Sequence, residues 1–144
     1  MNMSFQEKSV WATLTTIVLS YGFYFIIYIS NIIAGNIGYE PKMMPLFFAV
    51  TILLVIALVA LHVIIALSNV KEAEDYQDER DKLIEYKAEA NSSWILGIGA
   101  LATAAVSVLD LMSKFAIGNL IFFFLVISEV TKHSIQLYHY RRGI

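Results

Sequence analysis

The chain has 144 residues, 58% of them hydrophobic, and its mean hydropathy is +0.68. A soluble domain of this length cannot bury so large an apolar share, so we expect the surrounding solvent to be a lipid bilayer. The formal net charge of −2 argues against a nucleic-acid partner, and the lack of cysteine excludes disulfides, thiolate zinc sites and cysteine nucleophiles.

The first apolar segment, residues 10–33, contains no charged residue. About 20 such residues cross the hydrocarbon core of a bilayer. The segment is longer than the apolar core of a signal peptide, and no small-residue cleavage site follows it. We therefore predict a first membrane-spanning helix. Residues 34–45 hold two glycines and both prolines, which predicts a turn, with Pro45 in the first turn of the next helix.

Three more apolar segments follow, at residues 44–67, 93–112 and 117–138, the last two separated by a short turn at residues 113–116. Residues 68–92 between the second and third segments carry most of the charge and are expected to lie in water. The predicted fold is all-α: an antiparallel four-helix transmembrane bundle, forming a single membrane domain over residues 1–144, with a charged helical hairpin between helices 2 and 3.

The distribution of Lys and Arg predicts the orientation in the membrane. Four spans place both termini and the charged segment on one side, which carries seven Lys and Arg residues against two on the other, Lys42 and Lys114. Loops rich in Lys and Arg stay in the cytoplasm, whereas Asp and Glu contribute little to this bias. We expect both termini and the charged segment to be cytoplasmic.

The stretch Lys71–Glu89 holds eight acidic and four basic residues in nineteen positions. Its residues are strong helix formers without Gly or Pro, so we predict that the third helix begins near Asp78 and projects from the membrane before Trp94 enters it. Helical spacing gives this projection two edges. The apolar edge is Leu83, Tyr86, Ala90 and Trp94, and the acidic edge is Asp78, Asp81, Glu85 and Glu89.

The acidic edge has two interpretations. It is either a solvated helix face or a surface that binds a basic partner. The nearest basic groups are Arg141 and Arg142, because the end of the chain emerges on the same side. The candidate interaction residues at the cytoplasmic face are Asp78, Glu79, Arg80, Asp81, Glu85, Arg141 and Arg142.

The sequence DERDKLIEYKA after the second span, together with HYRRG at the end of the fourth, resembles an uncharacterised family of small four-span bacterial inner-membrane proteins. The resemblance implies a multi-pass protein of the bacterial inner membrane. It implies no activity, and it assigns no role to the residues of the DERD motif, Asp78 to Asp81.

Ionisable residues inside a membrane are candidates for function because hydrocarbon offers them no water. Those of the predicted spans are His62, Asp110, Glu129, Lys132 and His133. Glu129 and His133 lie one turn apart on the fourth helix and, with His62, could meet in the inner leaflet. They either relay protons or pair with each other and Lys132 near the interface.

Three functions remain open from the sequence. The first is a non-enzymatic membrane protein that binds or regulates a protein partner through the acidic hairpin; no catalytic residues, cofactor or metal are assigned to it. The second is a small proton- or ion-coupled transporter or channel that uses Glu129 and His133. The third is a haem- or metal-binding redox protein that uses His62 and His133. Small-residue positions on the third helix serve packing within one chain or within a homo-oligomer.

Overall fold

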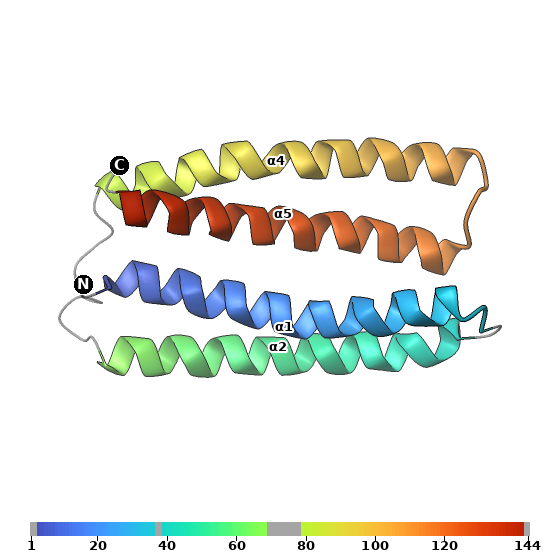
Figure 1. The fold of residues 1–144 in the computed structure, drawn as a ribbon, viewed down its shortest axis with the longest axis horizontal. Helices are drawn as coiled ribbons and strands as arrows, with labels where there is room; N and C mark the ends of the chain where they lie inside the picture. The colour runs from blue at the N-terminus through green and yellow to red at the C-terminus, as the bar shows by residue number, and fades with distance from the viewer. Residues whose placement is uncertain (1–2, 37–38, 69–78, 143–144) are drawn as a thin grey trace. The chain divides into compact units, whose positions relative to one another are not determined.

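The computed structural model describes residues 3–36, 39–68 and 79–142, and these residues fold into four helices without strands. The helices are α1 (Phe5–Ile33), α2 (Glu40–Ser68), α4 (Glu79–Val108) and α5 (Lys114–Arg142) (Figure 1). The all-α, four-helix prediction is confirmed. Each helix is long and apolar enough to cross a membrane, as expected of a multi-pass membrane protein. The chain divides into two compact units, Met1–Asp75 and Tyr76–Ile144.

In the first unit α1 and α2 lie side by side and run in opposite directions (Figure 1). The Thr13 hydroxyl contacts His62 near one end, whereas the Tyr21 hydroxyl donates to Thr51 nearer the other. As the residue number rises along α1, from Thr13 to Tyr21, the number of the contacted residue on α2 falls, from His62 to Thr51. This is the pattern of an antiparallel hairpin. α1 and α2 therefore pair directly with each other.

Aromatic rings fill the half of this unit nearest its turn. Tyr24 is only 1% exposed and packs edge-on against Phe25 and Phe47, with ring centroids 5.3 and 5.6 Å away. Tyr28 stacks parallel to Tyr24 at 6.2 Å and also contacts Tyr39, which lies just before α2. Between membrane helices the attraction is mainly close packing, so these rings stabilise the hairpin by contact area.

The turn of the first unit begins with a glycine that ends α1. Gly35 adopts a left-handed conformation with φ of +63°, and its N–H donates to the carbonyl of Ile32. The N–H of Asn36 donates to the carbonyl of Asn31, which completes a Schellman cap. Since α2 begins at Glu40, the turn in the structure is shorter than the predicted turn at residues 34–45. Pro45 lies inside α2.

The second unit is a helical hairpin of α4 and α5, whose turn occupies residues 109–113. α4 ends in the same kind of cap, because Asp110 has a φ of +51° and its N–H donates to the carbonyl of Ser107. The N–H of Leu111 reaches back to the carbonyl of Val106. Ser113 then caps α5, its hydroxyl accepting from the N–H of Ala116. This turn lies about four residues before the predicted one at residues 113–116.

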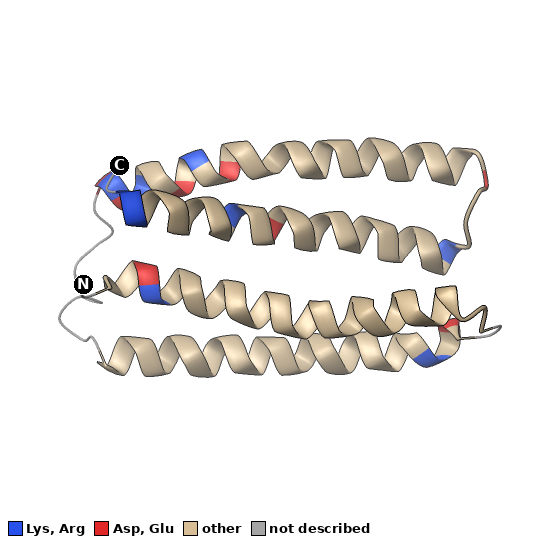
Figure 2. Cartoon of the chain, viewed as in Figure 1, with Lys and Arg blue, Asp and Glu red and all other residues tan. Residues whose placement is uncertain are grey.

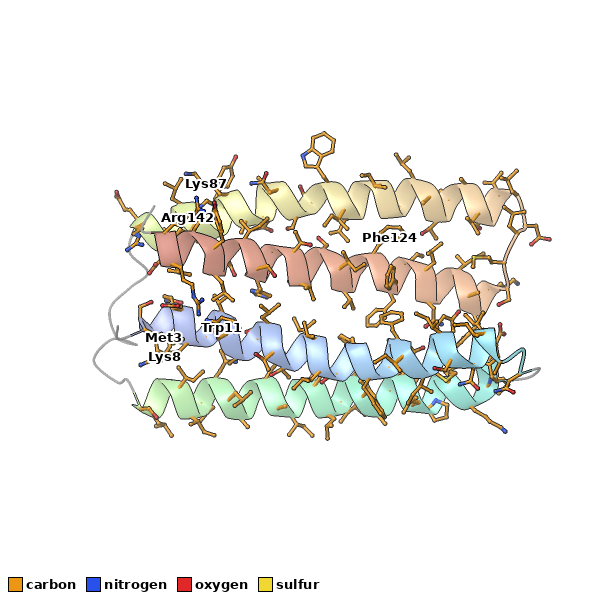
Figure 3. All side chains as sticks on the ribbon, viewed as in Figure 1. Met3, Lys8, Trp11, Lys87, Phe124 and Arg142 are labelled. Atoms are coloured by element: carbon orange, nitrogen blue, oxygen red, sulfur yellow. The ribbon has the colours of Figure 1, made fainter. Side chains whose placement is uncertain are left out.

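The backbone of α4 at Gly99 packs closely against the ring of Phe124 on α5. A side chain at Gly99 would overlap the ring of Phe124, which Figure 3 labels on α5. Nearer the free ends, the Ser128 hydroxyl donates to the carbonyl of Ser92, 2.9 Å away. The buried residues of α4 recur at helical spacing and form one face: Ile84, Ala88, Ser92, Gly99 and Thr103.

Most hydroxyl groups within the apolar helices are satisfied by their own helix. Thr16, Thr51 and Thr103, for example, each donate to the carbonyl four residues earlier, at distances of 2.7 to 2.8 Å. Because lipid offers no hydrogen-bond partner, this internal bonding lets polar side chains lie at membrane depth without a partner helix.

Candidate functional site

Charged side chains of the second unit gather at one end. Figure 2 shows blue and red residues where α4 begins and along the second half of α5, whereas residues 90–108 of α4 carry no charge. The other end carries only Asp110 and Lys114 among the described charged residues of this unit. We call the end formed by residues 79–92 of α4 and 128–142 of α5 the charged end.

The length of α4 explains where the charged end lies. α4 has 30 residues. At 1.5 Å per residue it measures about 45 Å, whereas the hydrocarbon core of a bilayer is about 30 Å thick. If the turn at Asp110 lies at one membrane boundary, about ten residues at the start of α4 extend beyond the other boundary. The prediction that the charged residues after Asp78 are helical and continuous with the third apolar segment is confirmed, since α4 begins at Glu79.

Asp81 faces α5 and not open water. Its carboxylate accepts a hydrogen bond from the phenol of Tyr140, near the end of α5. Burial, followed by the charge of Asp81, raises the pKa of the Tyr140 phenol above its ordinary value. Asp81 and Glu85 are both only partly exposed. Two residues of the predicted acidic edge thus belong to the packed side of the hairpin.

The predicted apolar edge of this segment lies on the outside. Leu83, Tyr86 and Trp94 are 49, 71 and 75% exposed. At about 100° per residue, they lie on the side of α4 opposite to the buried Ala88 and Ser92. The apolar side chains near the membrane boundary therefore face away from α5, and the acidic ones partly face it.

The two arginines at the end of α5 occupy the predicted position beside the start of α4. Figure 3 labels Arg142 on α5 and Lys87 on α4, both at the charged end. The Arg142 guanidinium lies over the ring of Tyr138, 4.6 Å from its centre. Arg141 and Arg142 are exposed, as are Glu79 and Arg80 in the first turn of α4.

Lys132 of α5 forms an ion pair with α4. Its ammonium lies 3.8 Å from the carboxylate of Glu89, so the pair bridges α5 and α4. Glu89 is largely exposed, and an exposed pair of this kind contributes about 0–1 kcal/mol. The expectation that Lys132 serves an ion pair near the interface agrees with this contact, but its partner is Glu89 and not Glu129.

Glu129, His133 and Gln136 form a short polar row along α5. Nε2 of His133 lies 3.7 Å from the Glu129 carboxylate, and Nδ1 lies 2.9 Å from the Gln136 side-chain oxygen. His133 is 15% exposed and Glu129 42% exposed. If Nδ1 carries a proton, it donates to Gln136, which fixes the ring and leaves Nε2 toward Glu129. The row can hold a proton between a carboxylate and an imidazole.

His62 belongs to the first unit, where it has partners of its own. Its Nδ1 lies 2.8 Å from the carbonyl of Leu58, and its Nε2 lies 3.4 Å from the Thr13 hydroxyl. Glu129 and His133 belong to the second unit. Within the described residues, no three His, Cys, Asp or Glu side chains lie close enough together to hold a metal ion.

Two further residues predicted from the sequence are Asp110 and Asp78. Asp110 is the capping residue of the α4–α5 turn and is exposed, so its role there is conformational. Asp78, expected to cap α4, lies outside the described residues. Tyr140 and Thr13 are not among the functional candidates named from the sequence, although Thr13 lies on the polar stripe of the first helix and Tyr140 near the end of the fourth.

Comparison of the chain with models of protein families, with curated proteins and with solved structures finds no match. The geometry of the charged end therefore carries the functional argument by itself.

Proposed function

We propose that this is a small, non-enzymatic protein of the bacterial inner membrane that binds or regulates a protein partner through its charged end. In this proposal the chain crosses the membrane four times, with both termini and the charged end in the cytoplasm. The excess of Lys and Arg at the termini and in residues 68–92 supports this orientation. The resemblance of the DERD and HYRRG sequences to small bacterial four-span proteins supports the location.

One observation carries the proposal: the charges of α4 and α5 gather toward one end of their hairpin, whereas α1 and α2, which are about as long, carry charges near their starts. Helices that only cross the bilayer need about 20 residues each. The extra turns hold exposed acidic and basic groups in a fixed relation, which is what a partner with complementary charge recognises. Glu79 and Glu89 are the exposed acids of the charged end, since Asp81 and Glu85 turn toward α5.

The proposal is tested by photo-crosslinking in native membranes. A photoreactive residue at Lys82 should yield a discrete protein adduct, whereas the same residue at Lys114 should not. Glu79→Gln together with Glu89→Gln should lower the adduct yield roughly three- to tenfold, because each exposed charge contributes about 0–1 kcal/mol.

The matched control is Glu40→Gln together with Asp110→Asn, which neutralises two acids at the turn ends and keeps a residue that tolerates positive φ at position 110. This control should leave the adduct unchanged. Equal adduct yields from the charged-end variant and the parent would contradict the proposed role of these acids.

A second function is favoured by the polar row on α5. A carboxylate 3.7 Å from an imidazole can exchange a proton with it, the amide of Gln136 orients that imidazole, and His133 is mostly buried. We propose proton-coupled transport as the alternative. Proton flux into liposomes should then fall at least about tenfold in Glu129→Gln, since that change removes the carboxylate of the polar row. Ser134→Ala, which alters an exposed neighbour, is the control.

A further inference from the structure

The half of the α1–α2 hairpin that lies away from its turn is packed differently from the half that holds the aromatic rings. None of residues 55–68 of α2 is buried, whereas Tyr24 in the aromatic half is only 1% exposed. We call residues 5–16 of α1 and 55–68 of α2 the free half. Here the two helices meet through a polar contact, in which Nε2 of His62 lies 3.4 Å from the Thr13 hydroxyl.

Both ring nitrogens of His62 face oxygen atoms. Nδ1 lies 2.8 Å from the carbonyl of Leu58, one turn earlier on α2. A carbonyl only accepts hydrogen bonds, so Nδ1 carries a proton and donates to it. Nε2 faces the hydroxyl of Thr13, and the same hydroxyl lies 3.0 Å from the carbonyl of Ser9. A hydroxyl can accept from Nε2 or donate to it, so the protonation of His62 decides which of the two occurs.

A count of protons shows what protonation of His62 changes. When His62 is neutral, the single hydroxyl proton of Thr13 serves either Nε2 or the carbonyl of Ser9, and the other acceptor goes without it. When Nε2 is protonated, it donates to the Thr13 oxygen, and the Thr13 hydroxyl donates to Ser9. Each proton then has an acceptor, and the hydrogen bond between α1 and α2 has a charged donor. Such bonds are about twice as strong as neutral ones.

Few charged groups surround this contact within the first unit. The half of α2 around His62 contains no charged side chain. The charged side chains of α1 are Glu7 and Lys8, about 9 and 8 Å before Thr13 along the helix axis, and their charges are opposite. The nearest tyrosine of α1, Tyr21, lies about 12 Å beyond Thr13. His62 is partly exposed and about 9 Å from the end of α2, so protons can reach it from that end.

We propose that His62 and Thr13 form a proton-dependent link between α1 and α2. With a proton on both ring nitrogens, His62 donates to Leu58 and Thr13 and keeps the free half closed. When Nε2 releases its proton to water, the charged hydrogen bond is lost and the free half opens more often, while the aromatic half holds the hairpin together. The closed state binds the additional proton, so low pH favours it and rising pH weakens it. The link does not depend on the proposed protein partner or on the polar row of α5.

Distances between pairs of spin labels test the proposal. Because the chain has no cysteine, Thr15→Cys together with Val63→Cys places one label on each helix of the free half, at exposed positions. In the full chain in lipid vesicles, we expect the population of longer distances to be about three- to tenfold larger at pH 8 than at pH 5, the range in which histidine titrates. Ile29→Cys together with Met44→Cys labels the aromatic half and should show no such change.

Single substitutions added to the first label pair identify the titrating group. His62→Gln cannot gain a charge and should give the same distances at both pH values. Thr13→Val removes the acceptor of Nε2 and should also abolish the response, whereas Thr16→Val removes a hydroxyl that donates to its own helix and should preserve it. Equal distances at pH 5 and pH 8 in the parent pair would overturn the proposal, as would a response that survives His62→Gln or Thr13→Val. If His62→Gln does not fold, Thr13→Val, which keeps the shape of the side chain, decides the question.

Discussion

The two helical hairpins solve the same problem, pairing two membrane helices, by different means. α1 and α2 pair through aromatic rings and hydroxyl contacts, and the described charges of this unit lie near its ends (Figure 2). α4 and α5 pair through the close contact of Gly99 with Phe124 and then continue as a polar hairpin. The first hairpin is apolar along most of its length, whereas the second carries charges where α4 begins and along the second half of α5.

The largest effect is expected at Gly99, where α4 and α5 pack closely because glycine has no side chain. Gly99→Leu would force the leucine into the ring of Phe124 and separate α4 from α5. We expect a loss of about 3 kcal/mol in the free energy of unfolding, at the upper end of the usual cost of overpacking. Gly97→Leu is the control, because nothing lies within 4 Å of a side chain there. Reversible unfolding in detergent measures both, and equal losses would contradict this packing.

The first hairpin should respond most to the loss of Tyr24, its most buried ring. Tyr24→Ala removes the contacts with Phe25, Tyr28 and Phe47. We expect a cost of about 2–3 kcal/mol, somewhat below that of a soluble core because lipid also solvates apolar side chains. The neighbouring Phe23→Ala is a suitable control, since Phe23 is largely exposed. If both variants unfold at the same detergent concentration as the parent, the aromatic cluster does not hold this hairpin together.

A moderate effect is expected from the contact that closes the charged end. Tyr140→Phe removes the hydrogen bond to Asp81 and should cost about 1 kcal/mol. A double-mutant cycle with Asp81→Ala should give a coupling of about 0.5–1.5 kcal/mol. A coupling of zero would show that the two side chains act independently.

The same contact predicts a pH dependence. The pKa of Tyr140 is raised in the folded chain, so the folded state disfavours the ionised phenol. The stabilisation is therefore present below about pH 10, the pKa of an unfolded tyrosine, and is lost as the pH rises above it. The loss of stability between pH 9 and 11 should be smaller in Tyr140→Phe than in the parent. An identical alkaline loss in both proteins would contradict the raised pKa.

The smallest effect is expected for the ion pair between Lys132 and Glu89. Glu89→Gln should lower the free energy of unfolding by no more than about 0.5 kcal/mol, because the pair is largely exposed. About 0.5 M salt should remove the difference, since screening weakens such pairs. A salt-independent loss above 1 kcal/mol would mean that Lys132 has a buried role.

The sequence predicts the number, type and approximate positions of the helices well. Long uncharged segments need about 20 residues to cross a membrane, and Gly35 marks the end of α1 by its freedom to adopt positive φ. Asp110 is a less specific signal, because few aspartates adopt this conformation. The predicted turn at residues 113–116 therefore lies about four residues later than the turn in the structure, at residues 109–113.

The orientation of the charged helix is harder to predict. Helical spacing shows that α4 has an apolar and an acidic edge, but it does not show which edge faces α5. A rule that turns apolar residues inward holds in water and not beside lipid, and Trp94 and Tyr86 are exposed in the structure. The partner of Asp81 is Tyr140, which lies 59 residues away in sequence, and only the register of the hairpin brings them together.

The central claim is that the chain crosses the membrane four times and keeps the charged end of α4 and α5 in the cytoplasm. Since the chain has no cysteine, single cysteines report position without background. In intact cells, a membrane-impermeant maleimide should label Ala34→Cys and Met112→Cys near the two turns but not Glu79→Cys. Inverted vesicles should give the opposite result. Labelling of positions 79 and 112 from the same side would contradict the four-span account.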